Sequence, residues 1–198
     1  MYTLMNSVGL RSSEAYMQAD IAEHEKRLRR IRGTGILIID MQRDFVSYSE
    51  ETTKQLQAQN RLLEYSARYD MPVVVLEHTG YGQTLDSLMR IIGKVPRRQM
   101  IRKAYDDGFT NSKLACRLRS WSISNLCLTG VNASACVKRT AQGALSEGFT
   151  IETADDLIAE PLDWMQEKSA KWFASKGKWY NSHRDLISFY EYGQIQGQ

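Results

Sequence analysis

Three residues of different chemical type stand where apolar or strand-like runs of this sequence end. Asp40 follows one run, Lys103 follows another, and Cys136 lies six positions beyond Gly130, where a third run stops. A carboxylate takes the proton of a thiol, an ammonium group stabilises the negative charges, and the sulfur attacks a carbonyl carbon. These residue types therefore indicate a cysteine hydrolase. In such an enzyme the protonated acid later donates its proton to the leaving amine, and the carboxylate then activates water.

The surroundings of Cys136 predict a strand, a turn and the start of a helix. N–H groups at a helix start favour an anion, so we expect them to lower the thiol pKa and to hold an oxyanion. Each of the three residues also has a structural interpretation. Cys136 suits a buried core position and Asp40 suits a turn. Lys103 suits a solvated surface, where Arg102 and Lys94 are close alternatives for its role.

Alternating strand and helix patterns position these residues at one edge of a sheet. Such alternation predicts an α/β fold, a three-layer αβα sandwich around a mainly parallel sheet, and ligands then bind beyond the carboxyl ends of the strands. The segment 182–192 allows a helix followed by a last strand. We expect strands at 35–40, 72–77, 99–102, 125–129 and 149–153, and helices at 12–30, 51–68, 84–92, 111–120, 133–147 and 163–175.

Length and composition narrow the class of protein. The 198 residues predict a single domain, 1–198, with residues 1–33 as an N-terminal helical arm. A net charge of +3 is too small to indicate a nucleic-acid partner, and neither a signal peptide nor a membrane-spanning run is recognisable. Three cysteines, with Cys116 and Cys127 expected to be structural, favour a reducing, cytoplasmic setting. The three histidines are well separated, so no metal site is expected.

Three separated motifs give the chain a resemblance to a known family. They are Ile38-Ile-Asp-Met-Gln-Arg-Asp-Phe45, Arg102-Lys-Ala-Tyr-Asp-Asp-Gly-Phe109 and Gly130-Val-Asn-Ala-Ser-Ala-Cys-Val-Lys-Arg-Thr-Ala141. In type, order and spacing they resemble the motifs of the isochorismatase-like cysteine hydrolases, which include nicotinamidases and N-carbamoylsarcosine amidase. The resemblance covers roughly residues 35–158 and implies that Asp40, Lys103 and Cys136 are the catalytic residues.

The resemblance also implies the remainder of the site. Members of the family carry a non-proline cis peptide four residues before the cysteine, which here joins Val131 and Asn132. The N–H groups of Asn132 and Cys136 would then form the oxyanion hole, and Phe45 would line the substrate pocket. Nicotinamidases hold a metal through an Asp-x-His pattern and further histidines, which the segment 76–83 lacks. We therefore expect neither metal nor cofactor. His78, Tyr105 and Val131 are expected as further substrate contacts.

The expected activity is hydrolysis of a C–N bond in a small amide, ureide or carbamoyl compound through a thioester. Two alternatives remain open at this point: vinyl-ether cleavage of the isochorismatase type, and a non-enzymatic paralogue that acts as a binding protein. The expected partners are a small-molecule substrate and further copies of the chain in a homo-oligomer, with no nucleic acid and no membrane.

Overall fold

The computed structural model of the protein describes residues 4–46, 49–160 and 162–194. Its strands form one sheet in the order β3-β2-β1-β4-β5-β7, with the short β6 beside β4, and every ladder is parallel. The strands are β1 (Thr34–Ile39), β2 (Val73–His78), β3 (Arg98–Lys103), β4 (Asn125–Val131), β5 (Thr150–Ala154), β6 (Ile158–Ala159) and β7 (Lys178–Tyr180).

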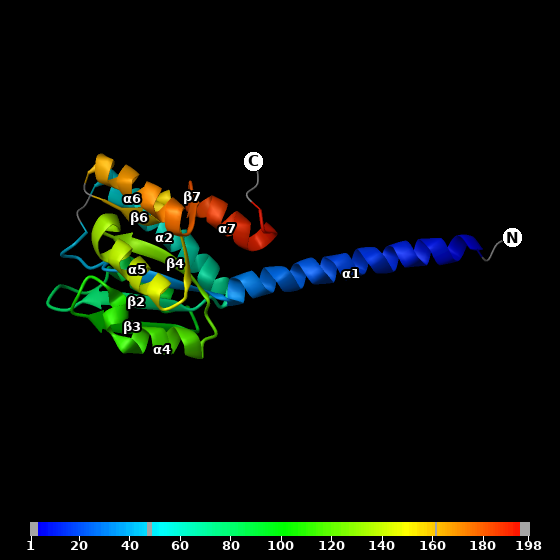
Figure 1. Ribbon diagram of the computed structural model, residues 1–198, viewed down its shortest axis with the longest axis horizontal. Helices are drawn as coiled ribbons and strands as arrows, with labels where there is room; N and C mark the ends of the chain where they lie inside the picture. Colours follow the sequence, from blue (N-terminus) through cyan, green and yellow to red (C-terminus); the bar gives the residue numbers. More distant parts are fainter. Residues whose placement is uncertain (1–3, 47–48, 161, 195–198) are drawn as a thin grey trace.

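Helices cover both faces of this sheet, while the long first helix extends away from it (Figure 1). The three-layer α/β fold expected from the alternating pattern is therefore confirmed. The helices are α1 (Leu4–Arg32), α2 (Glu50–Tyr69), α3 (Asp86–Ile92), α4 (Ser112–Ser120), α5 (Lys138–Ser146), α6 (Asp163–Lys176) and α7 (His183–Tyr192), with short turns η1 (Gly108–Thr110), η2 (Ala133–Val137) and η3 (Asp155–Leu157).

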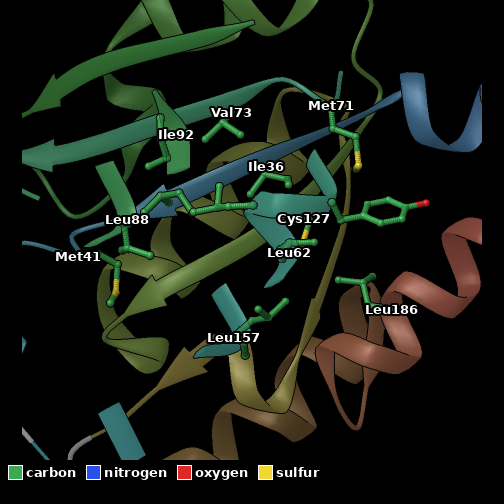
Figure 2. Close-up of a cluster of buried hydrophobic side chains, with 14 of the residues drawn as sticks. Ile36, Met41, Leu62, Met71, Val73, Leu88, Ile92, Cys127, Leu157 and Leu186 are labelled. Atoms are coloured by element: carbon green, nitrogen blue, oxygen red, sulfur yellow. The ribbon is translucent and has the colours of Figure 1, made fainter. Parts of the chain in front are cut away.

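Two apolar layers hold the sheet, because the buried strands are apolar on both faces. Ile36 and Ile38 of β1 point into one layer and Leu37 and Ile39 into the other. Figure 2 shows part of the first layer, where Ile36 and Cys127 of the sheet pack against helical residues. The labelled side chains in that view are Ile36, Met41, Leu62, Met71, Val73, Leu88, Ile92, Cys127, Leu157 and Leu186.

The structure departs from the expected elements in four places. Helix α1 begins at Leu4, eight residues before the expected start, and the expected helix 133–147 opens with a π-helical turn, η2. Two short strands, β6 and β7, escaped the sequence analysis because two or three residues carry no periodic pattern. The last strand precedes α7 and does not follow it within the described residues.

The chain order of the strands changes direction between β1 and β4, and in open parallel sheets the ligand crevice lies beyond the carboxyl ends of the strands at such a switch point. Asp40 follows β1 directly, and Cys136 follows β4 within η2. Gly130 has φ +133°, and a Cβ there would overlap the Ile39 carbonyl, so only glycine lets the two strands approach this closely. The side chain of Gln55 holds the same place from α2, where its Nε2 donates to the Gly130 carbonyl at 2.9 Å.

Candidate active site

A buried ion pair lies at the end of the sheet. Lys103 Nζ is 2.8 Å from Asp40 Oδ2, and the two side chains are 0% and 2% exposed. The strand register brings them together, because Asp40 N–H donates to the Leu76 carbonyl and Lys103 pairs with His78 on the neighbouring strand. Asp40 has φ +52°, so the chain turns sharply at the residue that carries the carboxylate.

The Lys103 ammonium makes one further contact, which fixes its direction. It donates to the carbonyl of Tyr105 at 3.2 Å. A buried charge is tolerated only when it is paired and hydrogen-bonded, and this cation meets both conditions. The Oδ1 atom of Asp40 is buried and has no hydrogen-bond partner among the described residues. This oxygen is therefore available to the Cys136 thiol or to a group that enters the site.

Cys136 reaches this pair from the other side of the crevice. Cys136 lies in η2. Thr140, in the following helix α5, binds the backbone of the loop that follows Lys103. Thr140 Oγ1 accepts from Gly108 N–H at 3.0 Å and donates to the Asp106 carbonyl at 3.2 Å. These two hydrogen bonds hold Asp106 beside Cys136, whose Sγ donates to Asp106 Oδ1 at 3.4 Å.

The thiol of Cys136 is difficult to ionise in this setting. Its pKa is raised from 9.0 to about 12, first by burial and then by the hydrogen bond and negative charge of Asp40. The Lys103 charge lowers this pKa, and Asp106 raises it further. Our expectation of a lowered thiol pKa is therefore wrong for this structure, because burial and two carboxylates outweigh one ammonium. The resting sulfur carries its proton at neutral pH.

The backbone before Cys136 adopts the expected unusual geometry. The Val131–Asn132 peptide bond is cis, as the family resemblance implied. Asn132 is extended and precedes η2, and its carbonyl accepts from the N–H groups of Ala135 and Val137. The side chain of Glu160, just after β6, accepts from Ser134 N–H within the same turn. The Asn132 carbonyl and the Glu160 carboxylate thus accept from three backbone N–H groups of the turn that carries Cys136.

The expected substrate contacts have different fates. Phe45 stacks with Tyr81, with ring centroids 4.3 Å apart, and His78 meets the same rings from the end of β2. Val131 is buried at the end of β4. Tyr105 differs, because its side chain is 68% exposed and its contribution is the carbonyl that holds Lys103. Phe45, His78 and Val131 thus lie at or shortly after the carboxyl ends of β1, β2 and β4, Tyr105 holds Lys103 through its carbonyl, and the contact of all four with a substrate stays a prediction.

Sequence reasoning missed two carboxylates, Asp106 and Glu160. Asp106 stands inside a quoted motif, but nothing in the sequence says which of the two adjacent aspartates caps the next turn. The structure gives that task to Asp107, which accepts from Phe109 N–H, and leaves Asp106 for the sulfur. Glu160 depends on the two-residue strand β6, which has no sequence signature. The side chain of Gln42, also missed, bonds the backbone of His78 and Gly82.

The hollows of the described surface lie away from the site. Hollows of about 540 Å³ and 1240 Å³ lie over β3 and α4 and over α2 and α7, and neither is lined by Asp40, Lys103 or Cys136. Across the part of the chain that the structure describes, no three His, Cys, Asp or Glu side chains gather as metal ligands do. No described helix combines the length and apolarity needed to cross a bilayer.

The arrangement defines an α/β protein with a cysteine, a carboxylate and an ammonium group at the sheet's switch point. The family model for the isochorismatase domain matches residues 34–182, and the chain belongs to this family. A streptothricin hydrolase of Streptomyces noursei is 29% identical over 134 residues, which cover 63% of this chain and 49% of that protein. The chain thus spans about half the length of the curated relatives it matches.

Solved structures share the fold at low sequence identity. A ribonuclease of Caenorhabditis elegans superposes with a TM-score of 0.70 at 17% identity, covering 82% of this chain and 83% of that one. The nicotinamidase of Staphylococcus aureus gives a TM-score of 0.68 at 20% identity, covering 75% of this chain and 97% of that one. At these identities the likeness concerns the fold, and the activity has to be argued from the residues of the site.

Proposed function

We propose that the protein is a cysteine hydrolase that cleaves a C–N bond of a small amide, ureide or carbamoyl compound. The observation that carries this proposal is the buried ion pair of Asp40 and Lys103, 2.8 Å apart, at the crevice that also holds Cys136. Family membership and the hydrolase name of a relative support it. Three unpaired cysteines support the expected reducing, cytoplasmic setting.

Because the resting thiol is protonated, we propose that Asp40 takes its proton as the sulfur attacks. The Sγ–C bond forms, the carbonyl electrons move to oxygen, and the N–H groups of Asn132 and Cys136 stabilise that oxyanion. Asp40 then returns the proton to the nitrogen as the C–N bond breaks, which leaves a thioester. Water attacks the thioester, Asp40 takes the water proton, and the sulfur regains it as the acid departs.

Lys103 has an electrostatic task in this scheme. Its ammonium compensates the negative charge of Asp40 at rest and stabilises the charge that develops on sulfur. A neutral side chain at this position would leave the Asp40 carboxylate buried and uncompensated. We assign no step to a metal or cofactor.

A screen of small amides, ureides and carbamoyl compounds for released ammonia or amine tests the proposal. Protein alkylated at Cys136 and the Cys136→Ala variant serve as matched blanks. We expect at least one compound to be hydrolysed by the unmodified protein and by neither blank. Hydrolysis that survives alkylation would instead support acid-catalysed vinyl-ether chemistry, and the absence of turnover with every compound would support a binding protein.

A further inference from the structure

The charges around the nucleophile do not cancel. Asp40 and Lys103 neutralise each other, but Asp106 lies beside the Cys136 sulfur, and Glu160 accepts from Ser134 N–H in the helical turn that carries this cysteine. Among the described residues, no lysine, arginine or histidine forms an ion pair with either of these two carboxylates. We propose that the substrate carries a positive charge near its scissile bond and that Asp106 and Glu160 bind it, an inference that rests on the proposed function.

Asp106 is placed for this task by its backbone. Thr140 Oγ1 donates to the Asp106 carbonyl at 3.2 Å, which holds the Asp106 backbone near Cys136. The Asp106 side chain is exposed to solvent. One carboxylate oxygen faces the sulfur at 3.4 Å. A cationic group that arrives from solvent therefore meets this carboxylate directly at the nucleophile.

Glu160 adds a second charge and blocks the opposite kind of ligand. It accepts from Ser134 N–H, so it already occupies a backbone donor that would otherwise attract an anion. Its other oxygen, Oε2, is buried without a hydrogen-bond partner among the described residues. A donor from the substrate would satisfy that oxygen, whereas a substrate carboxylate would be repelled.

Two features outside these carboxylates agree with a cation. Asp40 is 1% exposed, and within the described part of the chain its Oδ1 has no hydrogen-bond partner, so a donor group of the substrate can bind this oxygen when the thiol does not. The rings of Phe45, His78 and Tyr81 gather at the ends of β1 and β2. Aromatic faces attract ammonium and guanidinium groups.

Charged thiol reagents test this inference without any substrate. A methanethiosulfonate transfers its thioalkyl group to the Cys136 sulfur, releasing methanesulfinate and forming a mixed disulfide. A trimethylammonium-ethyl reagent and a sulfonatoethyl reagent differ in charge. The protein would carry Cys116→Ser, because Cys116 is exposed and Cys127 is fully buried. Peptide mass mapping would follow modification of Cys136 over time.

We expect the cationic reagent to modify Cys136 at least about tenfold faster than the anionic one, since each nearby charge shifts the two rates in opposite directions. Asp106→Asn with Glu160→Gln should bring the ratio close to one. The matched control, Asp70→Asn with Glu167→Gln, removes two carboxylates that pair with Arg97 and Lys171 elsewhere, and should keep it. Each variant's thiol pKa affects both reagents equally, so the ratio reports local charge.

A ratio near one in the starting protein, or an equal ratio in the two double variants, would overturn this inference. Neither result depends on amide turnover, so an unsuccessful substrate screen would leave this test intact. Conversely, efficient hydrolysis of neutral or anionic amides, unchanged by Asp106→Asn with Glu160→Gln, would overturn the charge preference and leave the hydrolase proposal standing.

A different observation concerns helix α1, which extends away from the sheet without covering it (Figure 1). Every described side chain from residue 16 to residue 26 is exposed, including Tyr16, Met17 and Ile21 at 76%, 57% and 48%. A helix without tertiary packing is marginally stable in water, and exposed apolar side chains in a row mark a contact surface.

The apolar residues of α1 follow a coiled-coil spacing. Met17, Ile21, Leu28 and Ile31 fall on alternating steps of three and four, with His24 in the remaining position. Ile31 belongs to the core at the foot of the helix, so the stripe runs outward from the body. We infer that this stripe pairs with α1 of a second copy of the chain, in antiparallel orientation.

Charge decides the partner and its direction. Beside the apolar stripe of α1, acidic residues occur farther from the sheet and basic residues occur in the last two turns, next to the sheet. An antiparallel pair sets the acidic part of each helix against the basic part of the other, whereas a parallel pair sets like against like. The acidic residues are Asp20, Glu23 and Glu25, and the basic ones are Lys26, Arg27, Arg29, Arg30 and Arg32.

Sedimentation velocity of the intact protein tests this pairing. We expect a mass about twice 22.7 kDa, and a monomer for Met17→Glu with Ile21→Glu. Ala19→Glu with Ala22→Glu adds the same charge on the opposite face and should remain dimeric. Oxidation should fail to cross-link Met17→Cys, because residue 17 meets itself only in a parallel pair. A monomeric starting protein, equal behaviour of the two glutamate variants, or cross-linking through residue 17 would contradict the inference.

Discussion

Both ends of the sheet place a buried carboxylate beside a cysteine, yet we assign chemistry to only one end. At the carboxyl end, Asp40 meets Cys136 and the ammonium of Lys103. Toward the amino end, Glu152 of β5 pairs in register with Cys127 of β4. The two sets share residue types and burial, so the partners of each carboxylate decide what it does.

The amino end uses neutral partners. The hydroxyl of Tyr190 donates to Glu152 Oε1 at 2.6 Å, and the Asn125 amide donates to the same oxygen. Burial raises the pKa of Glu152, and burial with the Glu152 charge raises the pKa of Cys127 well above 9.0. The charge of Lys178 lowers the Glu152 pKa, but among the described residues no cation forms an ion pair with this carboxylate as Lys103 does with Asp40. An ion-paired cation and access from the crevice thus distinguish Asp40 and Cys136, to which we assign chemistry, from Glu152 and Cys127.

Removing each cysteine in turn should break the comparison most strongly. Cys136→Ala should lower turnover by about 10⁴-fold or more, because the nucleophile is lost, while the fold is retained. Cys127→Ala should keep turnover and cost about 1–2 kcal/mol of unfolding free energy, because it leaves a small cavity in the core. Amide hydrolysis and urea unfolding measure the two effects. Equal turnover in both variants would remove the distinction between the two ends.

Removing the cation should convert the reactive end into an unstable one. Lys103→Met leaves the Asp40 carboxylate buried without its partner, and the variant should lose about 3–5 kcal/mol of unfolding free energy. Lys103→Met with Asp40→Leu removes both charges and should recover most of that loss without recovering turnover. Urea titration of the two variants provides the measurement. A single variant as stable as the double one would show that the pair is not electrostatically coupled.

The smallest expected effect concerns the amino end and depends on pH. Because the folded-state pKa of Glu152 is raised, its protonated form is favoured by folding. That contribution is fully present below the unfolded pKa of glutamic acid and is lost as pH rises through the folded value. Glu152→Gln should therefore gain about 1 kcal/mol relative to the starting protein between pH 4 and pH 7. A stability difference that stays constant with pH would contradict this.

Much of this fold was predictable, because its central strands carry strong local signals. Continuous apolar runs predicted β1 and β2, and both begin and end within one residue of expectation. Asn111 was expected to cap α4, and its side chain accepts from Lys113 N–H. Asp40 ends the strong strand β1, whereas Lys103 follows the weaker strand candidate 99–102, and the two side chains meet as an ion pair.

What the sequence could not supply depends on contacts between distant segments. The pKa of Cys136 follows from burial and from Asp40, Lys103 and Asp106 together, and no local pattern encodes that sum. Glu160 reaches the site only because β6 pairs with the end of β4. The hydrogen bond between Tyr190 and Glu152 was not predictable, because Tyr190 lies in α7, 38 residues further along the chain.

The central claim is that Asp40 acts directly on the Cys136 thiol, and alkylation against pH tests it most directly. Iodoacetamide modification of Cys136, followed by peptide mapping, would be measured between about pH 6 and pH 10 in the starting protein and in Asp40→Asn. With a thiol pKa of about 12, the starting protein should react slowly at pH 7 and faster throughout that range. Asp40→Asn removes the carboxylate that raises this pKa, so Cys136 should react faster at pH 7, although turnover is lost. Identical pH profiles for the two proteins would contradict the account.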